Sequence, residues 1–416
     1  MIEASKTDDR NSKSRFSYRL RFFVIVMILL FALPLSACGA KEDETVIKPA
    51  DYGTYGEQIA LTLAEDFPYR KAFSEQEKLA GQYVKEEFEK LGYEVEEQVF
   101  TSADGLMQSV NYIVSIPGEG LMRRESEGEY LSSKKTVIVG AHYDSNVPAL
   151  ESVDMPGYDG IQDNASGIGC LLTLAREIKT QKLGYDVVLV AFGCGSADFA
   201  GARAYAAKMT AAEIAAVDVM YCIESIYAGD KLYASSGHNS LEAGKKYEKR
   251  RKLYEAYDVV YNSTINSQNN VDLYYNMSGI YLDVNGDELP DIYREVTIEK
   301  SDYVPFDEAG IPIVFFESYD YNFSSFELMK ETKNLNLQGA GGRIRGTSLD
   351  SYLLLSPELG EDRLMSRINN TAFIILEAIK KGSHDSVSVS DYNAGVRLDP
   401  EIIVEETVPY NSKKTQ

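Results

Sequence analysis

The sequence predicts an α/β domain in which a mostly parallel central sheet carries helices on both faces. Short apolar runs with the composition of buried strands recur along the chain, at residues 136–140, 186–192, 219–223 and 312–316. Helical patterns lie between several of these runs, and such alternation is typical of parallel sheets that are covered on both faces. Ligands bind these sheets at the carboxyl ends of the strands, so the residues that follow each run are the candidate functional positions.

Residues 73–91 form the clearest predicted helix. Ser74 is followed three residues later by Glu77, which is a capping arrangement, and apolar residues then recur at three- and four-residue spacing until a glycine. Two further helices are predicted at residues 167–179 and 199–209. These helices would cover the sheet.

A tyrosine- and asparagine-rich insertion at about residues 240–300 interrupts the α/β pattern. Residues 283–291 carry acidic and amide side chains at the spacing of a calcium-binding loop. However, Glu288 and Arg294 stand where such a loop needs a glycine and a bidentate carboxylate. A hairpin that turns at residues 285–286 is the preferred interpretation.

The first 37 residues are expected to be a lipoprotein signal peptide. Basic residues precede an apolar run at residues 22–33, which is shorter than a bilayer span. The sequence Leu-Ser-Ala-Cys that follows resembles the lipobox of bacterial lipoproteins, which implies cleavage before Cys38 and lipidation of its sulfur. Residues 38–50 would then be a lipidated tether, and the protein would be exported and anchored to the outer face of the bacterial cell membrane.

Composition limits the remaining interpretations. One α/β domain is placed at residues 51–382, followed by a polar acidic tail at 383–416 that is either a docked strand or a loose end. The net charge of −22 argues against a nucleic-acid partner, because binding phosphates needs a basic face. Cys170, Cys194 and Cys222 lie in apolar or small-residue runs, so we expect buried thiols without a chemical role.

Several motifs at the predicted strand ends form a recognisable series. They are GAHYDS at residues 140–145, DNASG at 163–167, a small-residue turn before RAY at 203–205, and SDYVPF with GIPIVFF between 301 and 316. In order and spacing this series resembles the bacterial zinc aminopeptidases with a two-metal site, whose wider relatives are transferrin-receptor-like ectodomains and glutaminyl cyclases. The resemblance runs from about residue 73 to residue 381 and implies the zinc-exopeptidase fold.

The resemblance also implies a set of metal ligands. In such sites two zinc ions, about 3.5 Å apart, share a hydroxide that attacks the peptide carbonyl. His142 matches the histidine of the second metal, and Asp144 would orient its ring without binding metal. Asp163 matches the aspartate that bridges both metals. Glu224 falls where the next ligand, an aspartate, is expected, and it keeps a carboxylate.

Three positions depart from this pattern. Gly195 and Ser196 fall where the resemblance requires the general-base glutamate and a glutamate ligand of the first metal, and Gly346 falls where it requires the last histidine. Glycine has no side chain to accept a proton, and serine is a poor zinc ligand at neutral pH. We therefore assign no general base and expect either a single zinc, held by His142, Asp163 and Glu224, or a metal-free hydrogen-bonded cluster.

Other acids could replace the missing base under a different alignment. Asp198 would need a shifted turn, and Glu308 and Glu317 lie on the later motif. Tyr303 and Phe306 are expected to line a peptide pocket.

The sequence thus predicts a lipid-anchored pseudo-peptidase that binds peptides or an envelope partner, with hydrolysis lost or strongly reduced. The alternative is an active zinc-dependent aminopeptidase with a rearranged or single-metal site that releases amino-terminal residues. Whether the protein is an enzyme is open at this stage.

Overall fold

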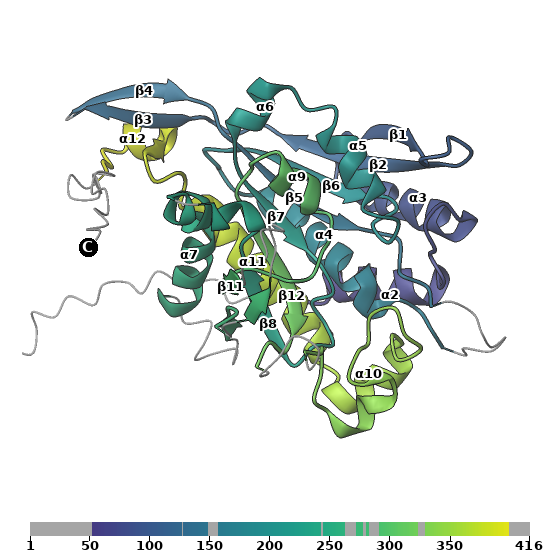
Figure 1. Ribbon diagram of the computed structural model, residues 1–416. Helices are drawn as coiled ribbons and strands as arrows, with labels where there is room; N and C mark the ends of the chain where they lie inside the picture. Colours follow the sequence, from purple (N-terminus) through teal and green to yellow (C-terminus); the bar gives the residue numbers. More distant parts are fainter. Residues whose placement is uncertain are drawn as a thin grey trace, which may run out of the picture. The chain divides into compact units, whose positions relative to one another are not determined.

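The structure is a computed structural model (Figure 1). It describes residues 52–126, 128–148, 157–242, 244–262, 272–277, 280–282, 291–322 and 329–398. The predicted signal peptide, lipobox and tether lie outside these residues. None of the helices in the described part of the chain is long and apolar enough to cross a membrane.

An eight-stranded sheet forms the centre of the domain, in the order β1-β2-β6-β5-β7-β12-β8-β9. The strands β6, β5, β7 and β12 pair in parallel, as β8 and β9 do, whereas β1–β2, β2–β6 and β12–β8 are antiparallel. The prediction of a mostly parallel central sheet is therefore confirmed. The bounds are β1 Glu96–Thr101, β2 Gln108–Ile116, β5 Thr136–His142, β6 Asp186–Phe192, β7 Val217–Ile223, β8 Lys231–Ser235, β9 Leu273–Tyr274 and β12 Ile313–Tyr319.

Side chains of the central strands alternate between two hydrophobic cores, as the two-residue period of a strand requires. On β5, Val137 and Val139 belong to the larger core, whereas Ile138 belongs to the smaller one. All three are 1% exposed or less. Both faces of the sheet are thus buried, which explains why these strands read as continuous apolar runs in the sequence.

Helices cover both faces, as expected. The larger core packs against α2 (Tyr55–Asp66), α3 (Glu75–Lys90), α4 (Ser166–Ile178), α7 (Lys246–Asn262) and α11 (Arg363–Lys380). The smaller core packs against α5 (Ala200–Ala206), α6 (Ala211–Ala216) and α9 (Val304–Glu308). In Figure 1, α5, α6 and α9 lie on the opposite side of the central strands from α11.

The predicted start and end of α3 are confirmed. Ser74 is its N-cap, and its side chain accepts a hydrogen bond from the amide of Glu77. Gly92 ends the helical segment with a φ of +82°, a conformation that suits glycine.

The insertion and the tail both contain strands. β10 (Ile280–Leu282) pairs antiparallel with β11 (Asp291–Tyr293), which supports the hairpin over the calcium loop, although the turn between them lies outside the described residues. In the tail, β13 (Ser386–Ser388) pairs with β3, so this part of it is a docked strand. The remaining elements are β3 (Leu121–Ser126), β4 (Glu129–Ser133), α10 (Tyr352–Leu359) and α12 (Val389–Asn393).

Candidate functional site

His142 is the last residue of β5 and lies at the carboxyl edge of the sheet, where the sequence predicts the site. Its Nδ1 is 3.1 Å from Asp144 Oδ1, and its Nε2 is 2.9 Å from Glu224 Oε2 and 3.4 Å from Asp163 Oδ1. All four residues are 3% exposed or less. The structure therefore brings together the three predicted ligands and the orienting carboxylate.

Charge pairing sets the protonation of His142 and Asp144. Burial alone would lower the pKa of His142, but Glu224 and Asp144 raise it well above its usual value. Burial opposes ionisation of Asp144, yet hydrogen bonds from His142 and Ser196 lower its pKa. The proton on the imidazolium thus supplies a positive charge among these carboxylates.

The turn after β6 holds the two positions where glutamates were expected. The Gly195 amide donates to Asp144 Oδ1 at 2.6 Å, and the Ser196 hydroxyl donates to Asp144 Oδ2 at 2.6 Å. A Cβ atom on Gly195 would lie only 2.4 Å from His142 Cγ. The His142 ring therefore occupies the space that any side chain at residue 195 would need.

Glu224 follows β7 directly and accepts several hydrogen bonds. Ser301 Oγ donates to its Oε2 at 2.6 Å, and Ser225 Oγ donates to its Oε1 at 3.0 Å. Burial would raise the pKa of Glu224, but His142 and Arg345 hold it below its usual range. Glu224 is therefore ionised and forms the anionic centre of the cluster.

Asp163 precedes α4 and is fixed through its backbone. Its amide donates to Asp350 Oδ2 at 3.1 Å, and its Oδ2 accepts from the Asn146 amide at 3.1 Å. Burial and the nearby Glu224 raise the pKa of Asp163 to about 7. This carboxyl group is therefore only partly ionised at neutral pH.

Asp302 joins the cluster although the sequence analysis did not select it. His142, Glu224 and Asp302 each offer one ligand atom, and these atoms all lie within 4.8 Å of one another. Asp302 is fully buried, and neither of its carboxylate oxygens has a hydrogen-bond partner among the described residues. Burial raises its pKa to about 8. The sequence signal was present, because this acid belongs to the SDYVPF motif.

Arg345 brings a second positive charge to the site, and the sequence analysis missed it as well. Its Nη1 is 3.4 Å from Glu224 Oε1, and its Nη2 donates to Glu299 Oε2 at 2.6 Å. The amides of Ile344 and Arg345 are held by Glu331 Oε2, at 2.6 and 2.9 Å. Arg345 directly precedes Gly346, the position where the resemblance requires a histidine. A guanidinium thus stands next to the missing ligand.

These residues fit one metal ion but not two. His142, Glu224 and the unpartnered Asp302 form a set of nitrogen and oxygen donors that suits a single divalent ion, with Asp163 beside it. For the other ion, Ser196 is bonded to Asp144 and Gly346 has no side chain to offer. Arg345 also places a cation against Glu224.

The expectation that Tyr303 and Phe306 line a pocket is wrong. Both are 1% exposed or less and belong to the smaller core. The Phe306 ring lies 6.0 Å from Phe192, and the Tyr303 ring 5.1 Å from Phe315, between centroids. Their aromatic faces pack against the sheet because α9 is a short helix that lies directly on it.

None of the alternative acids supplies the general base. Asp198 and Glu308 are exposed and pair with Arg203, at 3.2 and 3.1 Å. Glu317 is buried and accepts a hydrogen bond from Thr297 Oγ1 at 2.9 Å, and among the described contacts it makes none with His142. None of these three acids is therefore placed to act as the general base.

The cysteines are buried as expected, and the other two histidines do not belong to the cluster. His238 Nε2 is 2.8 Å from the Thr297 carbonyl oxygen, away from the cluster, and His384 is exposed. Cys170, Cys194 and Cys222 are buried free thiols.

Known proteins share this fold. A zinc aminopeptidase from Bacillus subtilis superposes with a TM-score of 0.51 at 14% identity, over 82% of this chain and 98% of that chain. A Zn-dependent exopeptidase from Parabacteroides distasonis gives 0.51 at 15% identity, over 80% and 99%. A glutaminyl cyclase from Porphyromonas gingivalis gives 0.50 at 15% identity, over 82% and 100%.

Sequence comparison agrees with the structural likeness. The alkaline phosphatase isozyme conversion protein of Escherichia coli K12 is 22% identical over 374 residues, which are 87% of this chain and 97% of the relative. The model of peptidase family M28 matches residues 123–332, half of the chain, and this segment includes His142, Asp163, Glu224 and Asp302. The chain therefore belongs to peptidase family M28.

Proposed function

We propose that this protein is a pseudo-peptidase of family M28 that binds peptides or an envelope partner without hydrolysing them. The observation that carries the proposal is the contact between Gly195 and the His142 ring. A Cβ atom at residue 195 would lie 2.4 Å from His142 Cγ, so this position has no space for a general-base side chain, which supports the proposal.

The charge balance of the site supports the same conclusion. In a two-metal site, cations neutralise the clustered carboxylates and stabilise charge in the transition state. Here Glu224 is paired with His142 at 2.9 Å and with Arg345 at 3.4 Å. Fixed protein cations thus take over part of the metals' role in neutralising the carboxylates. A missing general base by itself costs about 10²–10⁴ in rate.

One observation favours the alternative of a residual single-metal aminopeptidase. The unpartnered carboxylate of Asp302 completes a three-residue donor set with His142 and Glu224. A divalent ion bound there would polarise a peptide carbonyl. In this alternative, Ser301 would still orient Glu224 through its 2.6 Å hydrogen bond, and Asp144 would orient the His142 ring.

The test is hydrolysis and binding on the same preparation. We expect no chelator-sensitive release of the amino-terminal residue from aminoacyl-p-nitroanilides or short peptides, with or without added zinc. We expect fluorescence anisotropy to detect binding of peptides from a library. Chelator-sensitive turnover that Asp302→Asn abolishes, while the matched change Asp307→Asn leaves it intact, would overturn the proposal in favour of the single-metal enzyme.

We also propose that the protein is exported and anchored by lipid on Cys38. The support is sequence alone: an apolar run of twelve residues at 22–33, preceded by basic residues and followed by Leu-Ser-Ala-Cys. Metabolic labelling with a fatty acid should mark the wild-type protein, and Cys38→Ser should remove the label. Equal labelling of Cys38→Ser and wild type would contradict the anchor.

A further inference from the structure

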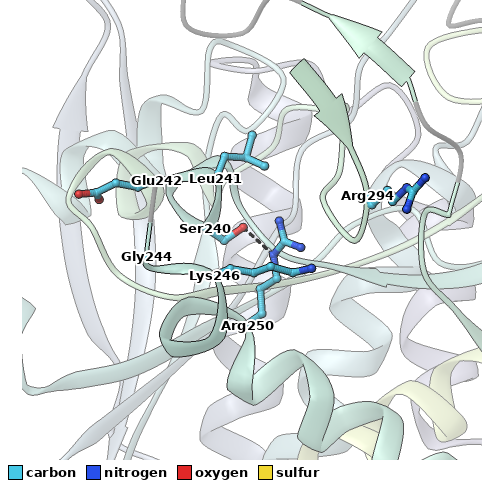
Figure 2. Close-up of a pocket in the computed structure, with 7 residues that line it drawn as sticks. All are labelled: Ser240, Leu241, Glu242, Gly244, Lys246, Arg250 and Arg294. Carbon is cyan, nitrogen blue, oxygen red and sulfur yellow. Dashed lines mark hydrogen bonds between the residues drawn. The ribbon is translucent and has the colours of Figure 1, made fainter. Parts of the chain in front are cut away.

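A pocket of about 470 Å³ lies beside the amino-terminal end of α7 and shares no residue with the candidate site. Its volume falls within the usual range for small-molecule sites. Its lining, shown in Figure 2, consists of Ser240, Leu241, Glu242, Gly244, Lys246, Arg250 and Arg294.

The pocket concentrates positive charge in a strongly acidic protein. The chain carries a net charge of −22, yet residues 245–252 (KKYEKRRK) include six lysines and arginines among eight positions. Lys246 and Arg250 are four residues apart on α7, so they project from the same face of the helix. Arg294, which directly follows β11, adds a third cation to the lining.

Arg250 is a buried cation that the surrounding structure holds in place. Its side chain is only 3% exposed. Its Nε donates to Ser240 Oγ at 3.0 Å, and its Nη1 donates to Glu295 Oε2 at 2.7 Å. Figure 2 shows its guanidinium beside Ser240 and Lys246. Neither of these two bonds uses Nη2, which carries two further N–H donors.

The acids near the pocket do not cancel this charge. Glu295 Oε2 accepts from Arg250 and also lies 3.3 Å from Lys246 Nζ, so one carboxylate serves two cations. Glu242 lines the pocket, but its carboxylate points away from Arg250 and Lys246 in Figure 2. Arg294 is exposed and makes no hydrogen bond or ion pair with another described residue, so its side chain is free to turn toward a ligand.

We infer that this pocket binds the phosphate group of a small phosphorylated molecule. A phosphate carries more negative charge than the single carboxylate of Glu295, and its several oxygens can accept from Lys246, Arg250 and Arg294 together. Lys246, the first residue of the seventeen-residue helix α7, lines the pocket, and a helix N-terminus favours a nearby anion. The inference is independent of the proposed function.

Isothermal titration of the full-length protein with inorganic phosphate and with glycerol 3-phosphate tests the inference, at constant ionic strength and with acetate as the comparison anion. We expect both phosphates to bind and acetate not to bind. Tighter binding of glycerol 3-phosphate would identify a phosphate ester as the ligand, and equal binding would identify free phosphate.

Variants connect the binding to the pocket. Lys246→Met and Arg294→Met change partly or fully exposed side chains, and each should weaken phosphate binding roughly tenfold. Lys245→Met removes the same charge from the adjacent residue, outside the lining, and should have little effect. Glu295→Gln should strengthen binding, because it frees Lys246 and Arg250 from a competing carboxylate, and misfolding cannot produce such a gain.

Two results would overturn the inference. One is the absence of phosphate binding at millimolar concentration to both the wild type and Glu295→Gln. The other is equal weakening by Lys245→Met and Lys246→Met, which would assign the binding to general surface charge.

Discussion

Arg345 offers the sharpest test of how the carboxylates of the site are neutralised, through the substitution Arg345→Met. Methionine keeps much of the length of the side chain but removes the charge. Among the described residues, Glu224 would then keep only His142 as its cationic partner, and Glu299 would lose the guanidinium that donates to it at 2.6 Å. Both carboxylates would remain in a mostly buried setting.

The magnitude follows from the 3.4 Å separation of Arg345 Nη1 and Glu224 Oε1. With an effective dielectric constant of about 20, their Coulomb attraction is about 5 kcal/mol. Removing one partner of a buried ion pair costs about 3–5 kcal/mol, because the other charge remains buried. Since the Arg345 side chain is 18% exposed, we expect the lower end of this range for the loss in unfolding free energy.

Urea unfolding measures this loss in unfolding free energy, and zinc titration measures the accompanying change in zinc affinity. Without the guanidinium, the free carboxylates should bind a divalent cation more tightly, so zinc should restore stability to Arg345→Met. A zinc concentration one hundred times the dissociation constant would return about 2.7 kcal/mol. Arg343→Met is the matched control, since Arg343 is exposed and its side chain contacts no described acid. Equal stability and equal zinc affinity of the two variants would refute the reasoning.

Three further predictions concern the same cluster. Asp302→Asn should raise the melting temperature of the metal-free protein more at pH 8 than at pH 5. Burial raises the pKa of Asp302 from about 3.9 to about 8, so this carboxyl contributes stability at low pH and loses it as the pH rises through that interval. An equal rise in melting temperature at both pH values would contradict this prediction. Gly195→Ala should lower the unfolding free energy by about 1–3 kcal/mol through overpacking against His142, whereas Gly339→Ala, whose added Cβ would meet only Leu349 at 3.9 Å, should have a much smaller effect. His142→Ala should weaken zinc binding at least tenfold by calorimetry, because it removes the nitrogen ligand; unchanged affinity, with His384→Ala as control, would exclude this site.

The fold was largely predictable because the central strands are buried on both faces. Residues 186–192 were predicted as a strand, and β6 has these bounds. The hairpin of β3 and β4 was not predicted, because its strands are mostly exposed and show little apolar alternation. An exposed ribbon of this kind leaves little hydrophobic signal in the sequence.

The candidate site was predictable where the chain keeps the residues of the motif and unpredictable where the chain departs from it. His142, Asp163 and Glu224 meet as expected. Arg345 was not predicted because the family pattern assigns no role to a basic residue at this position. Only the fold brings its side chain close to Glu224. Tyr303 and Phe306 were misassigned because aromatic residues next to a site motif serve equally well as core.

Zinc stoichiometry of the purified protein tests whether the site can hold two metal ions. After metal-free purification, the protein should be titrated with zinc, and the bound metal should be counted by atomic absorption after dialysis. We expect at most one tightly bound ion, which His142→Ala removes. Two tightly bound ions, with chelator-sensitive release of amino-terminal residues, would contradict this expectation and identify a working two-metal peptidase.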